Sequence, residues 1–128
     1  MYNNIINNIV GKFHLTKKFF KDTKGNLYKY MSQEWQDLIK SDYLFTQCKD
    51  CKYIYWCYYI KLNPKGRYYR ILIEFNIKTG LLENIMVQIP KPVNKEDEKR
   101  YNEIIKRAKK IFGYFVAVMI HHGYIEKI

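Results

Sequence analysis

Acidic side chains are scarce in this chain relative to basic ones. The sequence holds 12 aspartates and glutamates against 23 lysines and arginines, which gives a formal net charge of +11. An excess of this size on a small protein favours association with polyanions. We therefore expect nucleic acid as the first choice of partner, an acidic protein surface as the second, and an anionic membrane as the third.

Long apolar runs are also missing. No stretch reaches the roughly 18 apolar residues of a membrane-spanning helix, and Met1–Val10 lacks the basic start and unbroken apolar segment of a signal peptide. The three cysteines are an odd number and all lie within Cys48–Cys57, which suits a reducing compartment better than a disulfide framework. The sequence therefore predicts a cytoplasmic protein without membrane contact.

Catalytic and cofactor-binding motifs are absent as well. The sequence has no glycine-rich phosphate loop, no close acidic pair suited to metal-assisted chemistry, and no histidine beside a candidate nucleophile. His121 and His122 are adjacent, so on a helix they do not chelate one ion as an i, i+4 pair would. An imidazolium at a helix C-terminus is the simpler interpretation. We predict a non-enzymatic protein without a cofactor.

The cysteines permit a zinc interpretation without favouring it. Cys48 and Cys51 have the spacing of a zinc-ligand pair, and Cys57 follows. A second close pair is missing, and the histidines lie in distant segments. We therefore predict ordinary small buried thiols and no metal, with a zinc site or a redox pair as alternatives.

Strand-forming residues are what the chain has in abundance. Aromatic residues make up 17% and hydrophobic residues 48% of the sequence, which argues against disorder. Three β-branched and aromatic runs, Lys52–Leu62, Arg67–Ile77 and Leu81–Ile89, are separated by polar turns that contain glycine. The pattern predicts an antiparallel meander over residues 52–89.

Symmetric closure of the two loops predicts the register of this meander. It pairs Leu62 with Arg67 and Ile77 with Leu81. One face then carries the larger apolar side chains and is the predicted core face: Ile54, Trp56, Tyr58, Ile60, Tyr69, Ile71, Ile73, Phe75, Ile85, Val87 and Ile89. The opposite face, which we call the outer face, carries Tyr53, Tyr55, Cys57, Tyr59, Lys61, Tyr68, Arg70, Leu72, Glu74, Asn84, Met86 and Gln88.

The outer face combines aromatic rings with basic groups. Rings on an exposed sheet can stack on unpaired bases while lysine and arginine hold phosphates. The candidate binding residues on this face are Tyr53, Tyr55, Tyr59, Lys61, Tyr68 and Arg70. The alternative is that an N-terminal hairpin covers this face with Phe13, Phe19, Phe20 and Tyr28, which would make the tyrosines part of a core.

The N-terminal third contains weaker signals. Tyr2–Phe13 has apolar residues at helical spacing and is predicted as a short helix, although its isoleucines suit a strand equally well. Lys12–Lys21 and Leu27–Met31 flank a polar turn with glycine and predict a basic hairpin. Ser32 is a predicted N-cap for a helix that ends near Lys40. Two lysines of the predicted hairpin, Lys17 and Lys18, are further candidates for binding.

A long amphipathic helix is predicted over Lys95–His122. Asn94 can cap it, three acids occupy its first turn, and Gly123 is a natural terminator. At 1.5 Å per residue it is about 42 Å long, so one end should overhang the strands. Lys106, Lys109 and Lys110 lie off its apolar stripe as either a solvated face or a phosphate-binding stripe.

The last part of this helix predicts an assembly. Residues 111–120 are apolar nearly all round, and such a helix must be buried on every side. Either the N-terminal segments wrap it, or a second copy of the chain does. We favour a homodimer with Tyr114 and Val118 near its two-fold axis.

The sequence as a whole predicts a single α+β domain spanning residues 1–128, with an antiparallel sheet of about five strands packed against the long C-terminal helix. The favoured function is a small basic nucleic-acid-binding protein of a phage or other mobile element, with single strands preferred. A protein-binding inhibitor of a host nucleic-acid enzyme is the first alternative. The stretch Gly66–Arg70 resembles the basic sheet of small ribosome-dependent RNase toxins, so a toxin-like RNase is the second.

Overall fold

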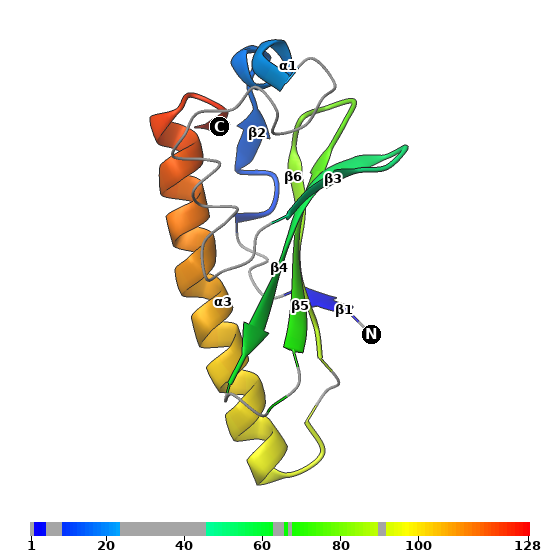
Figure 1. The fold of residues 1–128 in the computed structure, drawn as a ribbon, viewed down its shortest axis with the longest axis vertical. Coiled ribbons are helices and arrows are strands. Elements are labelled where there is room, and N and C mark those ends of the chain that lie inside the picture. The colour runs from blue at the N-terminus through cyan, green and yellow to red at the C-terminus, as the bar shows by residue number, and fades with distance from the viewer. Residues whose placement is uncertain (1, 5–8, 24–45, 63–65, 67, 90–91) are drawn as a thin grey trace.

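The computed structural model describes residues 2–4, 9–23, 46–62, 66, 68–89 and 92–128. In this part of the chain, one antiparallel sheet has the strand order β1-β6-β5-β4-β3, and β2 and β7 form a second, two-stranded sheet. Helix α3 runs along one face of the larger sheet (Figure 1). The elements are β1 (Tyr2–Asn4), β2 (Phe13–Leu15), α1 (Lys17–Thr23), β3 (Thr46–Lys49), β4 (Tyr53–Lys61), β5 (Tyr68–Asn76), β6 (Leu82–Gln88), α3 (Lys95–His121) and β7 (Ile125–Lys127). This is the predicted α+β fold.

The central strands pair in the predicted register. Ile54 of β4 lies opposite Phe75 of β5, and Lys61 lies opposite Tyr68. Strands β5 and β6 also follow the predicted register until a bulge between Glu74 and Phe75 shifts it by one residue.

The bulge keeps a charged side chain out of the core, where strict alternation of the strand would place one. Without it Glu83 would point to the core side beside Phe75. With it, Leu82 lies opposite Phe75 and is fully buried, while Glu83 stays partly exposed. Burying leucine in place of a carboxylate avoids the cost of desolvating a charge.

The predicted pairing of Ile77 with Leu81 is therefore wrong. The backbone N–H of Asn76 donates to the Leu81 carbonyl instead, at 2.9 Å. Gly80 closes the turn with a φ of 75°, and a Cβ there would lie 3.3 Å from the backbone oxygen of Leu15. A tight turn and a close backbone neighbour both require glycine at this position.

The core lies between the sheet and α3. Every residue predicted for the core face is buried. The Trp56 ring packs against Phe115 of α3 at a centroid distance of 5.2 Å and against Phe19 of α1 at 5.7 Å. The hydroxyl of Tyr58 donates to the carbonyl of Ala108 at 3.2 Å, and burial raises the pKa of Tyr58, so this donor keeps its proton. One sheet face thus packs against both described helices, α1 and α3.

Helix α3 begins and ends as predicted. The side chain of Asn94 accepts from the backbone N–H of Asp97 at 2.8 Å. At the other end Gly123 has a φ of 72°, and the N–H of Tyr124 donates to the carbonyl of Met119 at 2.9 Å. This is a glycine C-terminal motif that satisfies the last carbonyls of the helix.

Two N-terminal predictions are wrong. Tyr2–Asn4 form a strand that pairs with β6, and Phe13 begins strand β2, so the predicted helix does not extend over Tyr2–Phe13. The first arm of the basic hairpin is replaced by β2 and α1. The hairpin prediction assumed that this arm pairs with the next segment of the chain. Strand β2 pairs instead with the C-terminal strand β7. The second arm, Leu27–Met31, and the helix from Ser32 to Lys40 lie outside the described residues.

Thr16 explains why the chain turns into a helix here. Its hydroxyl accepts from the N–H of Phe19 at 3.3 Å, the bond of an N-cap, and donates to the carbonyl of Gly123. Its own N–H donates to the carbonyl of Tyr124 at 3.0 Å. One side chain therefore starts α1 and ties it to the end of α3.

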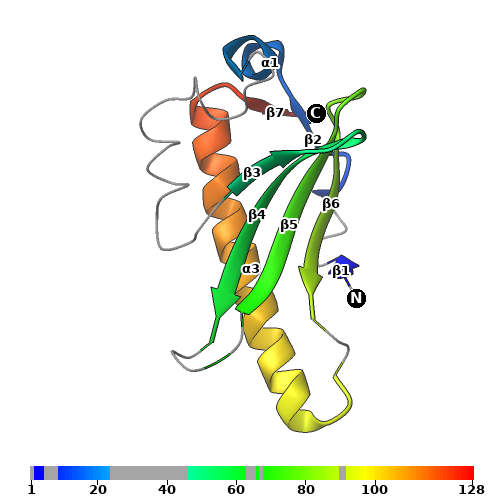
Figure 2. The same ribbon diagram turned by 45° about the vertical axis from the view of Figure 1, so that its right-hand side comes forward.

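The overhanging end of α3 is its charged N-terminal half (Figures 1 and 2). The apolar C-terminal half lies over the sheet beside β7, where Phe112, Phe115 and Met119 are buried. Its outward side is not buried within the described residues, since Tyr114 is 50% and Ile120 47% exposed. A homodimer through residues 111–120 stays a prediction.

Neighbouring aromatic residues of α3 allow a matched test of the core. Phe115→Ala should lower the free energy of unfolding by about 3–5 kcal/mol, because it empties the space against Trp56. Tyr114→Ala removes an aromatic ring from the exposed side and should change it by about 0.5 kcal/mol or less. Chemical denaturation measures both, and equal losses would contradict the packing described.

Candidate nucleic-acid interface

The outer face is left uncovered by the described elements. Helices α1 and α3 and strand β2 all contribute to the core on the Trp56 side. Figure 2 looks onto the outer face, with β4 and β5 in front of α3. The alternative in which Phe13 and Phe19 cover the tyrosines is wrong, because both rings belong to the core cluster. Tyr28 lies outside the described residues.

The most open part of this face is at the C-terminal end of β4 and the start of β5. We call Tyr59, Lys61, Tyr68 and Arg70 the aromatic end. Tyr59 is 39% and Tyr68 54% exposed, and their rings meet edge to face at 6.0 Å. The Lys61 ammonium lies 4.7 Å from the centre of the Tyr68 ring. Two rings and two cations therefore share one small area.

Arg70 is held in place by Cys57, which lies in the middle of the outer face. Its Nε donates to the Sγ of Cys57 at 3.0 Å. Cys57 and Leu72 lie opposite each other and are buried, and Met86 extends the row onto β6. This apolar row forms the floor between the two ends of the outer face.

The other end of the face has a different chemistry, and we call Tyr53, Tyr55, Glu74 and Asn84 the Glu74 end. Glu74 lies between Tyr55 and Asn84 in adjacent strands and is only 9% exposed. Its Oε1 accepts from Asn84 Nδ2 at 3.0 Å. Burial raises the pKa of the Glu74 carboxyl. The hydrogen bond from Asn84 acts against this rise in the pKa.

The neighbours of Glu74 add to its unusual environment. Asp50 and Glu83 raise its pKa further, and Lys52 lowers it. The Lys52 ammonium lies 5.1 Å from the Tyr53 ring centre. Sequence reasoning placed Glu74 and Asn84 on this face but did not select them as site residues. An acid at an outward position of a central strand was the available signal.

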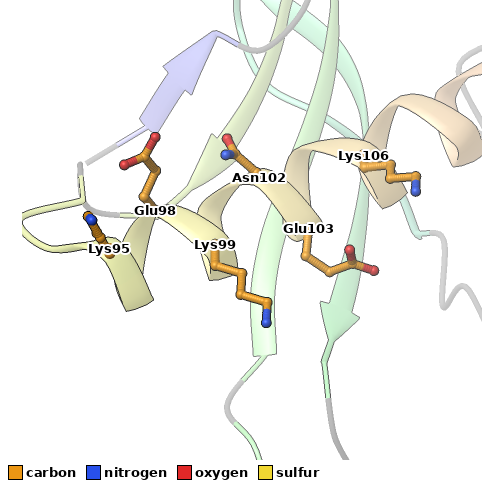
Figure 3. Close-up of a pocket in the computed structure, with 6 residues that line it drawn as sticks. All are labelled: Lys95, Glu98, Lys99, Asn102, Glu103 and Lys106. Atoms are coloured by element: carbon orange, nitrogen blue, oxygen red, sulfur yellow. The ribbon is translucent and has the colours of Figure 1, made fainter.

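The basic stripe of α3 lies elsewhere. Lys106, Lys109 and Lys110 are exposed on α3, on the side turned away from the sheet. A shallow hollow of about 500 Å³ lies along the same helix. It is lined by Lys95, Glu98, Lys99, Asn102, Glu103 and Lys106 (Figure 3). Charges of both signs alternate in it, as on a solvated helix face. The stripe and the outer face therefore point to opposite sides of the molecule.

Arg107 links α3 to the aromatic end. Arg107 donates through Nη1 to the backbone carbonyl of Lys61 at 3.2 Å and through Nε to Glu103 at 3.2 Å. It fixes the end of β4 against the helix. The candidate lysines Lys17 and Lys18 lie far from this point, on α1 at the opposite end of the sheet (Figure 1). Lys18 instead covers the Tyr124 ring at 4.7 Å.

The cysteines and histidines form no metal site among the described residues. In that part of the chain, no group of three or more histidine, cysteine or acidic side chains could hold an ion. The prediction of buried thiols is confirmed for Cys57 and wrong for Cys51, which is an exposed free thiol in the turn before β4. The side chain of Cys48 lies outside the description. His14 lies 3.5 Å from Glu126 across the β2–β7 pair.

Comparison of the chain with models of known protein families, with curated proteins and with solved structures gives no significant match. Among the described residues, no helix is long and apolar enough to cross a membrane. What this protein binds must therefore be inferred from the chemistry of the outer face.

The raised pKa of Glu74 predicts how stability depends on pH. Its folded-state pKa lies above the unfolded value, so the folded state binds more protons, and this contribution to stability falls as pH rises through that window. Glu74→Gln keeps an acceptor for Asn84 and carries no charge. The variant should melt at a higher temperature than the wild type above the window and at a similar one below it.

Thermal melts across a pH series measure this difference. Glu83→Gln is the matched control, because Glu83 also accepts from an asparagine, Asn76 at 3.0 Å, but remains more exposed. A stability gain in Glu83→Gln equal to that in Glu74→Gln would contradict a special environment for Glu74.

Proposed function

We propose that this protein is a non-enzymatic, cytoplasmic binder of single-stranded nucleic acid and that the outer face holds the strand. The observation that carries the proposal is the exposure of Tyr59 and Tyr68 beside Lys61 and Arg70 on a face that no described element covers. Elsewhere in the described chain, large aromatic rings mostly fill the core.

The energetics support a ligand for this end of the face. Stacking of a base on an aromatic ring contributes about 1–3 kcal/mol and tolerates any base sequence. Lys61 and Arg70 add phosphate contacts that release counterions. The overall charge of +11 raises the local concentration of a polyanion before any contact forms. Both terms act on the same ligand.

Unpaired bases suit this face better than a duplex. A stacking platform needs bases whose faces are accessible, and in a duplex these are already stacked. The stripe on α3 faces away from the platform, so in this proposal Lys106, Lys109 and Lys110 strengthen the field and do not hold the same short strand.

An acidic protein partner is the second candidate. The exposed side chains of Tyr114 and Ile120 favour it, because apolar groups beside a basic stripe suit a protein surface with charge complementarity. The same side chains favour the homodimer. Co-purification from a host lysate tests for the protein partner, and sedimentation of Ile120→Glu tests for the homodimer. Whether bound RNA stays intact tests the toxin-like RNase activity.

Two tyrosines of similar exposure provide the decisive comparison. Tyr68→Ala should weaken binding of a short single strand by about 1–3 kcal/mol, because it removes a stacking ring. Tyr114→Ala removes a ring of similar exposure from the far side and should leave affinity unchanged. Fluorescence anisotropy measures both affinities, and thermal melts check folding. Equal affinities for the two variants would rule out the platform.

Phosphate contact by Lys61 makes a prediction about salt. The slope of log affinity against log salt concentration should fall in magnitude by about 0.7 in Lys61→Gln, the value for one contact to a single strand. Lys110→Gln on α3 should keep the wild-type slope. The reverse pattern would place the strand on the helix stripe, and a wild-type affinity that is insensitive to salt would exclude phosphate contacts.

A further inference from the structure

We propose that the Glu74 end of the outer face recognises guanine in the bound strand, with the Glu74 carboxylate accepting from the Watson–Crick edge of that base. This inference rests on the proposed function, since it assigns a base preference to the same face. It uses residues that the stacking platform does not need.

Glu74 has acceptor capacity left over. An ionised carboxylate can accept about four hydrogen bonds, and among the described residues Asn84 is the one hydrogen-bond partner of Glu74. The Glu74 residue as a whole is 9% exposed, and burial is the main cause of the raised pKa of its carboxyl. A carboxylate that burial separates from part of its water, with one described donor in return, bears a desolvation cost. A ligand with paired donors would offset that cost.

The sign of the local charge selects the part of a strand that fits. Asp50 and Glu83 act on Glu74 in the same direction as burial, and Lys52 opposes them. A phosphate placed among these groups would be repelled. The strand must therefore present a base edge here and keep its phosphates near Lys61 and Arg70. The two ends are about 13 Å apart, four residues along β4 at about 3.3 Å each.

The donor pattern selects guanine. Its Watson–Crick edge carries two adjacent donors, the ring N1–H and the exocyclic amine, which match the two oxygens of one carboxylate. In unpaired strands this edge is accessible. Adenine has a donor beside an acceptor, and the acceptor would meet the carboxylate unfavourably. Tyr55, directly opposite Glu74 and half-buried, offers a ring beside the base.

Short oligothymidylate strands that carry one guanine, hypoxanthine or adenine test this inference by anisotropy titration. The wild type should bind the guanine strand about tenfold tighter than the adenine strand, in the range of one bidentate contact. Hypoxanthine lacks the exocyclic amine and should fall between them. Glu74→Gln should abolish the preference, because its amide presents a donor to a donor, whereas Glu83→Gln should keep it.

The outcomes separate this inference from the proposed function. Salt-dependent binding of all strands with equal affinity would overturn the guanine site and leave the platform standing. A guanine preference that survives in Glu74→Gln would also overturn it, since another group would then read the base. If no strand binds, both fail. Loss of the preference in Glu74→Gln alone, with a melting temperature no lower than that of the wild type, supports the site.

Discussion

The packing of Trp56 against Phe115 and Phe19 is the interaction on which the rest of the structure depends. Strand residues alternate between two faces, so a sheet that buries one face against helices fixes what the other face displays. Because α3 and α1 both pack on the Trp56 side, the outer-face residues Tyr59 and Tyr68 remain exposed, and Lys61 and Arg70 remain partly exposed. The candidate interface follows from that division.

Much of this division could be predicted from local sequence. Period-two alternation and two glycine-containing turns predicted the β4–β5 register, and Asn94 and Gly123 predicted the limits of α3. The bulge at Glu74 could not be predicted from strict alternation, because it depends on whether Leu82 or Glu83 is cheaper to bury. The β2–β7 pair was missed since its strands are more than a hundred residues apart in the chain.

The candidate site could likewise be predicted only in part from the sequence. The alternation of residues along the strands predicted which tyrosines share the outer face. The lysines of α1 and α3 were grouped with these tyrosines because of their charge alone. The fold separates these lysines from the aromatic end, and charge in a sequence carries no information on that separation. The two ends of the outer face also differ: Lys61 and Arg70 suit phosphates, and the partly desolvated Glu74 suits donors on a base edge. One strand lying along β4 would meet both.

The most direct test of the account is a map of the binding surface in solution. Backbone amide resonances of the labelled protein are followed by NMR while an unlabelled short oligothymidylate is added. Binding on the outer face should shift the resonances of Tyr59, Lys61, Tyr68 and Arg70 and leave those of Tyr114 and Ile120, on the outward side of α3, unchanged. Shifts confined to α3, with the outer face unchanged, would contradict it.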